Sequence, residues 1–238
     1  MEIYKYIKAH DTLNPKLWDG FILKEDVADK IMQIAEFFVN KIKDNDIEIN
    51  IKDVWILGSN ASYNYNENSD LDVHIMVDPS EINMEFSVAE KIYNSYRNLF
   101  KETYAPIIKG IPVEIYFEAF KGSNNVSEGV YSMNEGWLKK PKKEMLKVNS
   151  EEANAKYDYY VGEFNSLQEK ISHEDLNYQL EEVNNLLNQI YSLRSYGLTY
   201  GGEFSSENIV FKELRSKGYI NALRQLKREI ENKLLSLA

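Results

Sequence analysis

Two aspartates with one residue between them, Asp70 and Asp72, stand at the beginning of an apolar run that extends to Val77. Side chains two residues apart on a strand point to the same face, so the two carboxylates would repel each other. A cation between them relieves that repulsion. Carboxylate oxygens are the ligands that Mg²⁺ or Mn²⁺ accepts from a protein when phosphates supply others. The spacing therefore predicts a metal site at Asp70 and Asp72.

A third acid can come from the alternating run IPVEIYFEAF, residues 111–120, in which Glu114 and Glu118 share one face. The period of two does not distinguish them. If this strand runs parallel to residues 71–77, Glu114 lies nearer the aspartates, and if it runs antiparallel, Glu118 does. Three acids on two strands can hold two metal ions about 3.5–4 Å apart, which activate an attacking oxygen and stabilise a leaving pyrophosphate.

The pair Gly58-Ser59 follows the short apolar run VWILG, residues 54–58, and precedes the aspartates. The run is typical of a strand buried on both faces. Glycine lets a phosphate approach the backbone closely, and Ser59 offers an N–H and a hydroxyl to phosphate oxygens. We therefore expect Gly58 and Ser59 to bind phosphates.

Gly58-Ser59, ten intervening residues and Asp70-Leu71-Asp72-Val73 together resemble the signature of the DNA polymerase β-like nucleotidyltransferase superfamily. The resemblance covers about residues 50–120. It implies that Asp70, Asp72 and Glu114 hold the catalytic Mg²⁺ or Mn²⁺, and that Gly58 and Ser59 hold the triphosphate of an NTP. It also implies transfer of a nucleoside monophosphate to an acceptor hydroxyl with release of pyrophosphate. The family's third acid is most often Asp, whereas this chain has Glu. A catalytically silent module that binds a nucleotide or a partner is therefore the alternative.

Other residues near the motif admit two interpretations each. His74 shares a face with Asp72 and is either a packed, hydrogen-bonded residue or a group that supports the site. Tyr63 and Tyr65 either cover the surface or stack on a nucleobase. A basic run is either solvated or contacts triphosphate or RNA, and it comprises Lys139, Lys140, Lys142, Lys143 and Lys147.

The elements that must position these residues follow from periodicity. The order helix, strand, Gly-Ser turn, strand, helix, strand predicts an α/β fold, with a nucleotidyltransferase-type mixed sheet flanked by helices and followed by an all-helical C-terminal domain. Predicted helices span residues 25–43 and about 84–103, the second with a stripe that includes Val88 and Leu99. A later helical stripe begins at Leu176 and ends at Gly197. We expect a catalytic domain over residues 1–120, a connecting segment over 121–150 and a helical domain over 151–238.

Composition limits the functional classes. The 238-residue chain has no cysteine, which excludes disulfides and thiolate chemistry and favours a reducing, cytoplasmic setting. No stretch is long and apolar enough for a membrane span. A formal net charge of −10 disfavours strong binding to duplex DNA. The expected partners are an NTP and an acceptor that is a small molecule, a protein or an RNA end.

Overall fold

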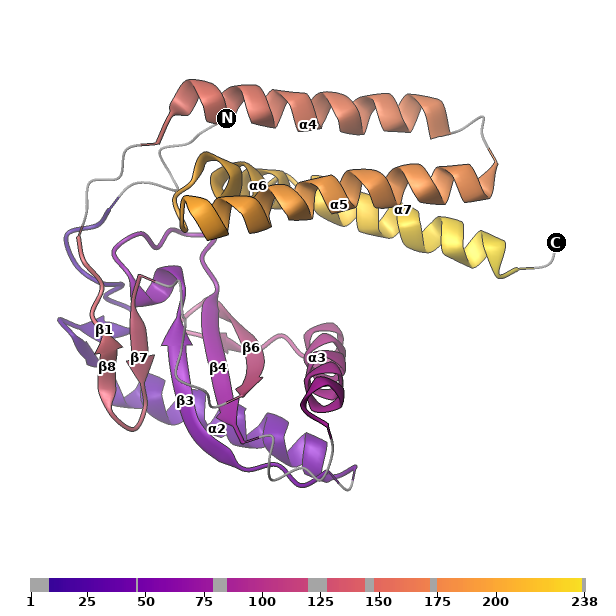
Figure 1. Ribbon diagram of the computed structural model, residues 1–238. Helices are drawn as coiled ribbons and strands as arrows, with labels where there is room; N and C mark the ends of the chain where they lie inside the picture. Colours follow the sequence, from indigo (N-terminus) through magenta and orange to yellow (C-terminus); the bar gives the residue numbers. More distant parts are fainter. Residues whose placement is uncertain are drawn as a thin grey trace. The chain divides into compact units, whose positions relative to one another are not determined.

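The computed structural model describes residues 9–45, 47–78, 85–119, 128–143, 148–171 and 175–236. These residues form two compact units, a sheet unit over residues 9–143 and a helical unit over residues 148–236. The fold is α/β, with a mixed six-stranded sheet in the first unit and four helices in the second (Figure 1).

The sheet has the strand order β5-β6-β4-β3-β7-β8. Its strands are β3 (Ile51–Leu57), β4 (Leu71–Val77), β5 (Ile107–Ile108), β6 (Ile111–Ala119), β7 (Val130–Ser132) and β8 (Gly136–Lys139). β3 and β4 are antiparallel, whereas β4 and β6 are parallel. A parallel neighbour requires a crossover connection, and the helix α3 (Phe86–Thr103) lies in the chain between β4 and β6. A separate hairpin pairs β1 (Trp18–Asp19) with β2 (Ile22–Leu23).

One face of the sheet packs against helix α2 (Glu25–Lys43) and part of α3. The buried face of β4 consists of Leu71, Val73, Ile75 and Val77, as its alternation predicts. β3 contributes to both faces, because Val54 and Ile56 join this core while Trp55 and Leu57 pack on the other side with Met76 and Val130. The continuous apolar run of β3 is thus buried on both faces, as predicted from sequence.

Helix α3 is rotated relative to its predicted apolar stripe. Val88 and Leu99 are 45% and 54% exposed, while Ala89, Tyr93 and Phe100 are buried. Tyr93 and Phe100 pack their rings near Phe117 of β6, with centroids 5.9 and 6.3 Å away. The aromatic contacts with Phe117 decide which face of α3 is buried, and the helix lies beside β6 (Figure 1).

Residues 130–139 were assigned from sequence to a connecting segment, but they form β7 and β8 and extend the sheet from β3. These strands are three and four residues long, which is too short for a clear alternation signal. Of the predicted basic run, Lys139, Lys140, Lys142 and Lys143 are exposed, and Lys147 lies outside the described residues.

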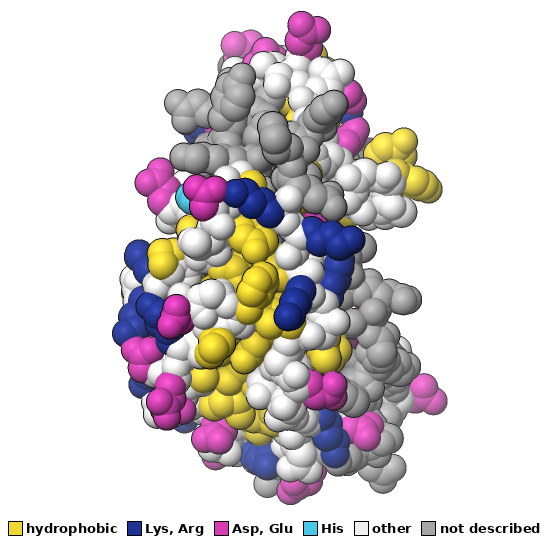
Figure 2. Space-filling view, turned by 90° about the vertical axis from the view of Figure 1, so that its left-hand side faces the viewer, with side chains coloured by type: hydrophobic (Ala, Val, Ile, Leu, Met, Phe, Trp, Pro, Cys, Tyr) yellow, Lys and Arg dark blue, Asp and Glu magenta, His cyan; other side chains and the backbone are white. Residues whose placement is uncertain are grey.

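The surface around β8 is both apolar and basic. Figure 2 shows a band of hydrophobic side chains with basic side chains beside it, on the side that carries β1 and β8 in Figure 1. Phe21, Ile22 and Leu138 are 42%, 72% and 43% exposed. The lysines are not simply solvated, because the ammonium of Lys140 lies 5.3 Å from the Phe21 ring centroid and Lys143 pairs with Asp11 at 2.6 Å.

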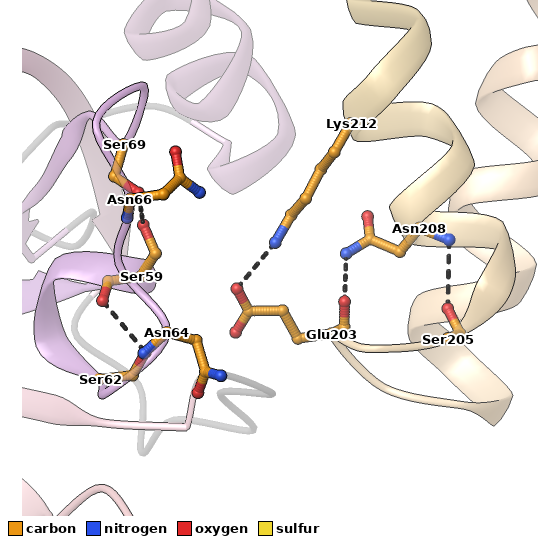
Figure 3. A network of polar contacts seen from close by, with 9 residues as sticks. All are labelled: Ser59, Ser62, Asn64, Asn66, Ser69, Glu203, Ser205, Asn208 and Lys212. Atoms are coloured by element: carbon orange, nitrogen blue, oxygen red, sulfur yellow. Dashed lines mark hydrogen bonds and ion pairs between the residues drawn. The ribbon is translucent and has the colours of Figure 1, made fainter. Parts of the chain in front are cut away.

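The helical unit contains α4 (Ser150–Ile171), α5 (Leu176–Tyr200), α6 (Ser206–Ser216) and α7 (Tyr219–Leu234), packed around a core of their own. Sequence analysis ended α5 at Gly197, but the helix continues to Tyr200. Gly197 is buried against the beginning of α6, where a Cβ would lie 2.5 Å from Ser205 Oγ, so no side chain fits there. Ser205 caps α6 by accepting a hydrogen bond from Asn208 N at 3.2 Å, and Lys212 pairs with Glu203 at 3.0 Å (Figure 3). Among the described residues, no helix is both long and apolar enough to cross a membrane.

Candidate metal centre

Three acids meet at one end of the sheet. Asp70 immediately precedes β4, Asp72 is its second residue, and Glu114 on β6 is the register partner of Asp72. One carboxylate oxygen of each lies within 4.8 Å of those of the other two, and all three side chains are half-buried. Ionised carboxylates this close repel one another. Their oxygens are also the hard donors that bind Mg²⁺ or Mn²⁺, so the three acids could hold such a cation.

The parallel pairing of β4 and β6 places Glu114, rather than Glu118, beside the aspartates. Glu118 is four residues further along β6, about 13 Å at a rise of 3.3 Å per residue, and is opposite Met76. Its carboxylate lies 2.9 Å from His74 Nδ1, and this contact holds the pKa of Glu118 below its ordinary value. His74 stacks on Tyr116 with ring centroids 4.4 Å apart, so it is packed and bonded within the sheet face.

Two cations from α3 hold Glu114. Arg97 Nη2 and Lys101 Nζ donate to the same oxygen, Oε1, at 2.9 and 2.7 Å. Burial raises the pKa of Glu114, but these two partners outweigh it and lower the pKa to about 2. Glu114 is therefore ionised throughout the neutral range. Because Arg97 and Lys101 both donate to Oε1, a metal ion could bind at the other carboxylate oxygen, Oε2.

The guanidinium of Arg97 also lies over the ring of Tyr116, 3.9 Å from its centroid. Burial raises the pKa of the Tyr116 phenol, and the negative charges of Asp72 and Glu114 raise it further. Tyr116 thus remains protonated, and its ring stacks with His74 and contacts the Arg97 guanidinium. Sequence reasoning did not identify Arg97 and Lys101. Their spacing of four residues on a helix was the available signal, but which face of α3 meets β6 was unknown.

Gly58 contacts Asp72 so closely that no side chain fits between them. Its φ is +74° and its ψ −161°, a combination that is essentially restricted to glycine. A Cβ at this position would lie 2.0 Å from Asp72 Oδ2. The glycine predicted to bind phosphate therefore has a second role that is visible in the structure, which is to leave room for the Asp72 carboxylate.

The turn after Gly58 is fixed by polar contacts (Figure 3). Ser59 begins a short 3₁₀ helix (Ser59–Ala61), and its hydroxyl donates to Ser69 Oγ at 2.8 Å. Asn60, fully buried, donates from Nδ2 to the carbonyl oxygen of Asp70 at 2.7 Å. Asn60 thereby ties the Gly-Ser turn to the first acid of the cluster. It was not identified from sequence, because a single Asn in a turn carries no distinguishing pattern.

The two tyrosines of the intervening loop have structural contacts in this unit. Tyr65 stacks on His10 with ring centroids 4.0 Å apart and an interplanar angle of 14°. His10 Nε2 lies 2.9 Å from the Tyr65 carbonyl oxygen, and the backbone N–H of His10 donates to the carbonyl oxygen of Tyr63. These contacts tie the loop to the segment before β1, which is consistent with the covering role considered for Tyr63 and Tyr65.

Comparisons of this chain with protein-family models, with curated proteins and with solved structures gave no match.

Proposed function

We propose that the chain is a metal-dependent nucleotidyltransferase with the acid cluster as its catalytic centre and a nucleotidyltransferase-type sheet unit. The observation that carries the proposal is the convergence of Asp70, Asp72 and Glu114 within 4.8 Å, next to the Gly58-Ser59 turn. The three carboxylates suit a divalent metal ion, and the glycine-containing turn next to them suits the phosphates of a metal-bound triphosphate.

In this proposal Asp70, Asp72 and Glu114 hold Mg²⁺ or Mn²⁺, and Gly58 and Ser59 contact the triphosphate. An ion held there would neutralise charge at the phosphates and would lower the pKa of an acceptor hydroxyl. The acceptor oxygen forms a bond to the α-phosphorus of the NTP while the bond from that phosphorus to the β-phosphate oxygen breaks. Pyrophosphate leaves, and the hydroxyl proton passes to a carboxylate of the cluster and then to solvent.

Binding of triphosphate should depend on a divalent cation, because the carboxylates of Asp70 and Asp72 repel a polyanion unless they are neutralised. A ligand at about 100 times its dissociation constant adds about 2.7 kcal/mol of stability. For a chain of this size that corresponds to a melting shift of several degrees, at about 2–4 °C per kcal/mol. The measurement is thermal unfolding with each NTP plus Mg²⁺ and with each NTP plus EDTA. Equal shifts under the two conditions would refute the metal-dependent site.

A matched pair of variants tests the residue assignment. Glu114→Gln removes a carboxylate of the cluster, whereas Glu118→Gln changes a carboxylate on the same face of the same strand about 13 Å away. We expect Glu114→Gln to reduce pyrophosphate release by at least about 10²-fold, and Glu118→Gln to retain it. Labelled NTPs with Mg²⁺ and cell extract supply the assay while the acceptor is being identified.

A catalytically silent nucleotide-binding module is the second candidate, and one observation favours it. Arg97 and Lys101 already neutralise Glu114, which reduces the demand for a cation at that carboxylate. A silent module would show NTP-dependent stabilisation without pyrophosphate release in extract, for the wild-type chain as well as for Glu114→Gln.

A further inference from the structure

A cavity of about 220 Å³ lies within the sheet unit, beside the acid cluster. We propose that this cavity binds the acceptor, and that the acceptor is a small uncharged hydroxyl compound with one ring. A phenol is the simplest example. The inference rests on the proposed nucleotidyl transfer, but the cavity can be tested separately from that activity.

The cavity lies directly against the acid cluster. Asp70 and Glu114 form part of its wall, so a molecule inside it reaches two of the three carboxylates. β4 lies between β3 and β6 in the sheet, and Asp72 pairs with Leu57 on one side and with Glu114 on the other. Gly58 follows Leu57. The Gly-Ser turn is therefore on the β3 side of Asp72, and the cavity is on its β6 side.

Phosphoryl transfer explains why the two sides matter. The attacking and leaving oxygens are roughly in line through the phosphorus, so they approach from opposite sides. With the triphosphate at the Gly58-Ser59 turn, pyrophosphate leaves on the β3 side. The acceptor oxygen then has to arrive from the β6 side, which is where the cavity opens onto Asp70 and Glu114. Among the residues that line the cavity in the described chain, neither Gly58 nor Ser59 appears.

Much of the cavity wall is aromatic or apolar. Three aromatic rings, Phe38, Phe100 and Tyr104, and two proline rings, Pro106 and Pro112, make up much of it. Phe38 packs on both of the other aromatic rings, with centroids 4.5 Å from Phe100 and 5.7 Å from Tyr104, so this part of the wall is already assembled. This apolar part of the wall favours a flat apolar body.

Size and charge narrow the ligand class further. An apolar cavity of about 150 Å³ is enough for one benzene ring, so 220 Å³ accommodates a substituted ring. The wall carries two acids, Asp70 and Glu114, and two cations, Arg97 and Lys101, which balance each other formally. A polyamine would find no surplus of acids there, and a neutral ring with one hydroxyl would find both donors and acceptors.

The binding test uses 4-fluorophenol with the full chain and measures its ¹⁹F line broadening, without metal or nucleotide. A variant that fills the cavity, Pro112→Trp, should weaken binding by about tenfold or more. Its matched control is Ile107→Trp, because Ile107 is the cross-strand partner of Pro112, is 62% exposed and does not line the cavity. A second variant, Tyr104→Ala, removes a wall ring from a 36% exposed position and should also weaken binding.

The comparison ligand is 4-fluorotoluene, which has the same ring without the hydroxyl. One hydrogen bond to a charged group should make the phenol bind about tenfold more tightly. With an NTP and Mg²⁺ present, 4-fluorophenol should also raise pyrophosphate release and yield a 4-fluorophenyl ester of the nucleoside monophosphate, detected by mass spectrometry.

The possible outcomes separate the two proposals. Magnesium-dependent NTP stabilisation without 4-fluorophenol binding overturns the acceptor cavity and leaves the transfer proposal in place. Phenol binding without any magnesium-dependent NTP stabilisation refutes the transfer proposal, and the acceptor role falls with it. Equal binding of phenol and toluene, or of phenol to wild type and Pro112→Trp, overturns the assignment of the cavity. Binding that follows the variants, together with ester formation, supports it.

Discussion

Replacing Gly58 by alanine should destabilise the sheet unit through its contact with Asp72. The backbone strain at φ +74° and ψ −161° costs about 1–3 kcal/mol. The new Cβ would lie 2.0 Å from Asp72 Oδ2, so the carboxylate must move to an unfavourable rotamer at about 1 kcal/mol more. We therefore expect a total loss of about 2–4 kcal/mol in the free energy of unfolding.

Urea unfolding followed by tryptophan fluorescence measures this loss for the sheet unit. The chain has three tryptophans, Trp18, Trp55 and Trp137, and all three belong to the sheet unit. Trp18 and Trp55 are buried. The fluorescence transition therefore reports the unfolding of the unit that contains Gly58, whether or not the helical unit unfolds with it.

Two controls separate the strain from the collision. Gly136→Ala introduces alanine at φ +79° where a Cβ has nothing within 4 Å, and it should cost only about 1–2 kcal/mol. An Asp72→Ala background removes the two closest atoms of residue 72, and the Cβ that remains lies 3.5 Å from the new Cβ at position 58, an ordinary contact. Gly58→Ala should then be less destabilising by about 1 kcal/mol. The same loss in both backgrounds would refute the collision argument.

Three further predictions concern charge and buried polarity in this unit. Asp72→Asn should raise the melting temperature of the metal-free chain by removing a like-charge repulsion, and collapse of this variant would instead indicate a structural carboxylate. Because the folded pKa of Glu114 is lowered to about 2, its contribution is complete above the ordinary pKa of 4.5 and is lost as the pH falls from there towards 2. Between pH 6 and pH 3, the free energy of unfolding measured in urea should fall by about 1–2 kcal/mol more in wild type than in Glu114→Gln. This difference includes an allowance for solvent screening at the exposed Lys101. Asp53→Ala should cost about 3 kcal/mol in urea unfolding, because it removes a buried acceptor that Trp55 Nε1 reaches at 2.7 Å, and a loss below 1 kcal/mol would contradict that estimate.

The local chemistry of the candidate site could be predicted from the sequence, because it depends on neighbours in the chain. The period of two on a strand fixes a common side for Asp70 and Asp72, and the following apolar alternation fixes which face of β4 is buried. The helix over residues 25–43 was also predictable, since its apolar positions recur at helical spacing over five turns and α2 has the predicted bounds.

What the sequence left open were relations between elements that are distant in the chain. The choice between Glu114 and Glu118 depended on strand direction, which the α3 crossover and the pairing of β4 with β6 decide. Residues 130–132 form a strand because the edge of β3 supplies their hydrogen-bond partners, and residues 136–139 pair in turn with that strand. Gly197 lies inside α5 instead of ending it, and the close approach of α6 leaves no room for a side chain there.

The face that α3 turns to the sheet has the largest consequence for the site. Periodicity fixes which residues share a helix face, but not which face meets a given strand. Packing of Tyr93 and Phe100 near Phe117 selects that face, and Arg97 and Lys101 are thereby brought onto Glu114. The sequence by itself determined the acids and their spacing, and the tertiary structure decided which cations neutralise them, because burial of aromatic area outweighs any local preference in orienting a helix.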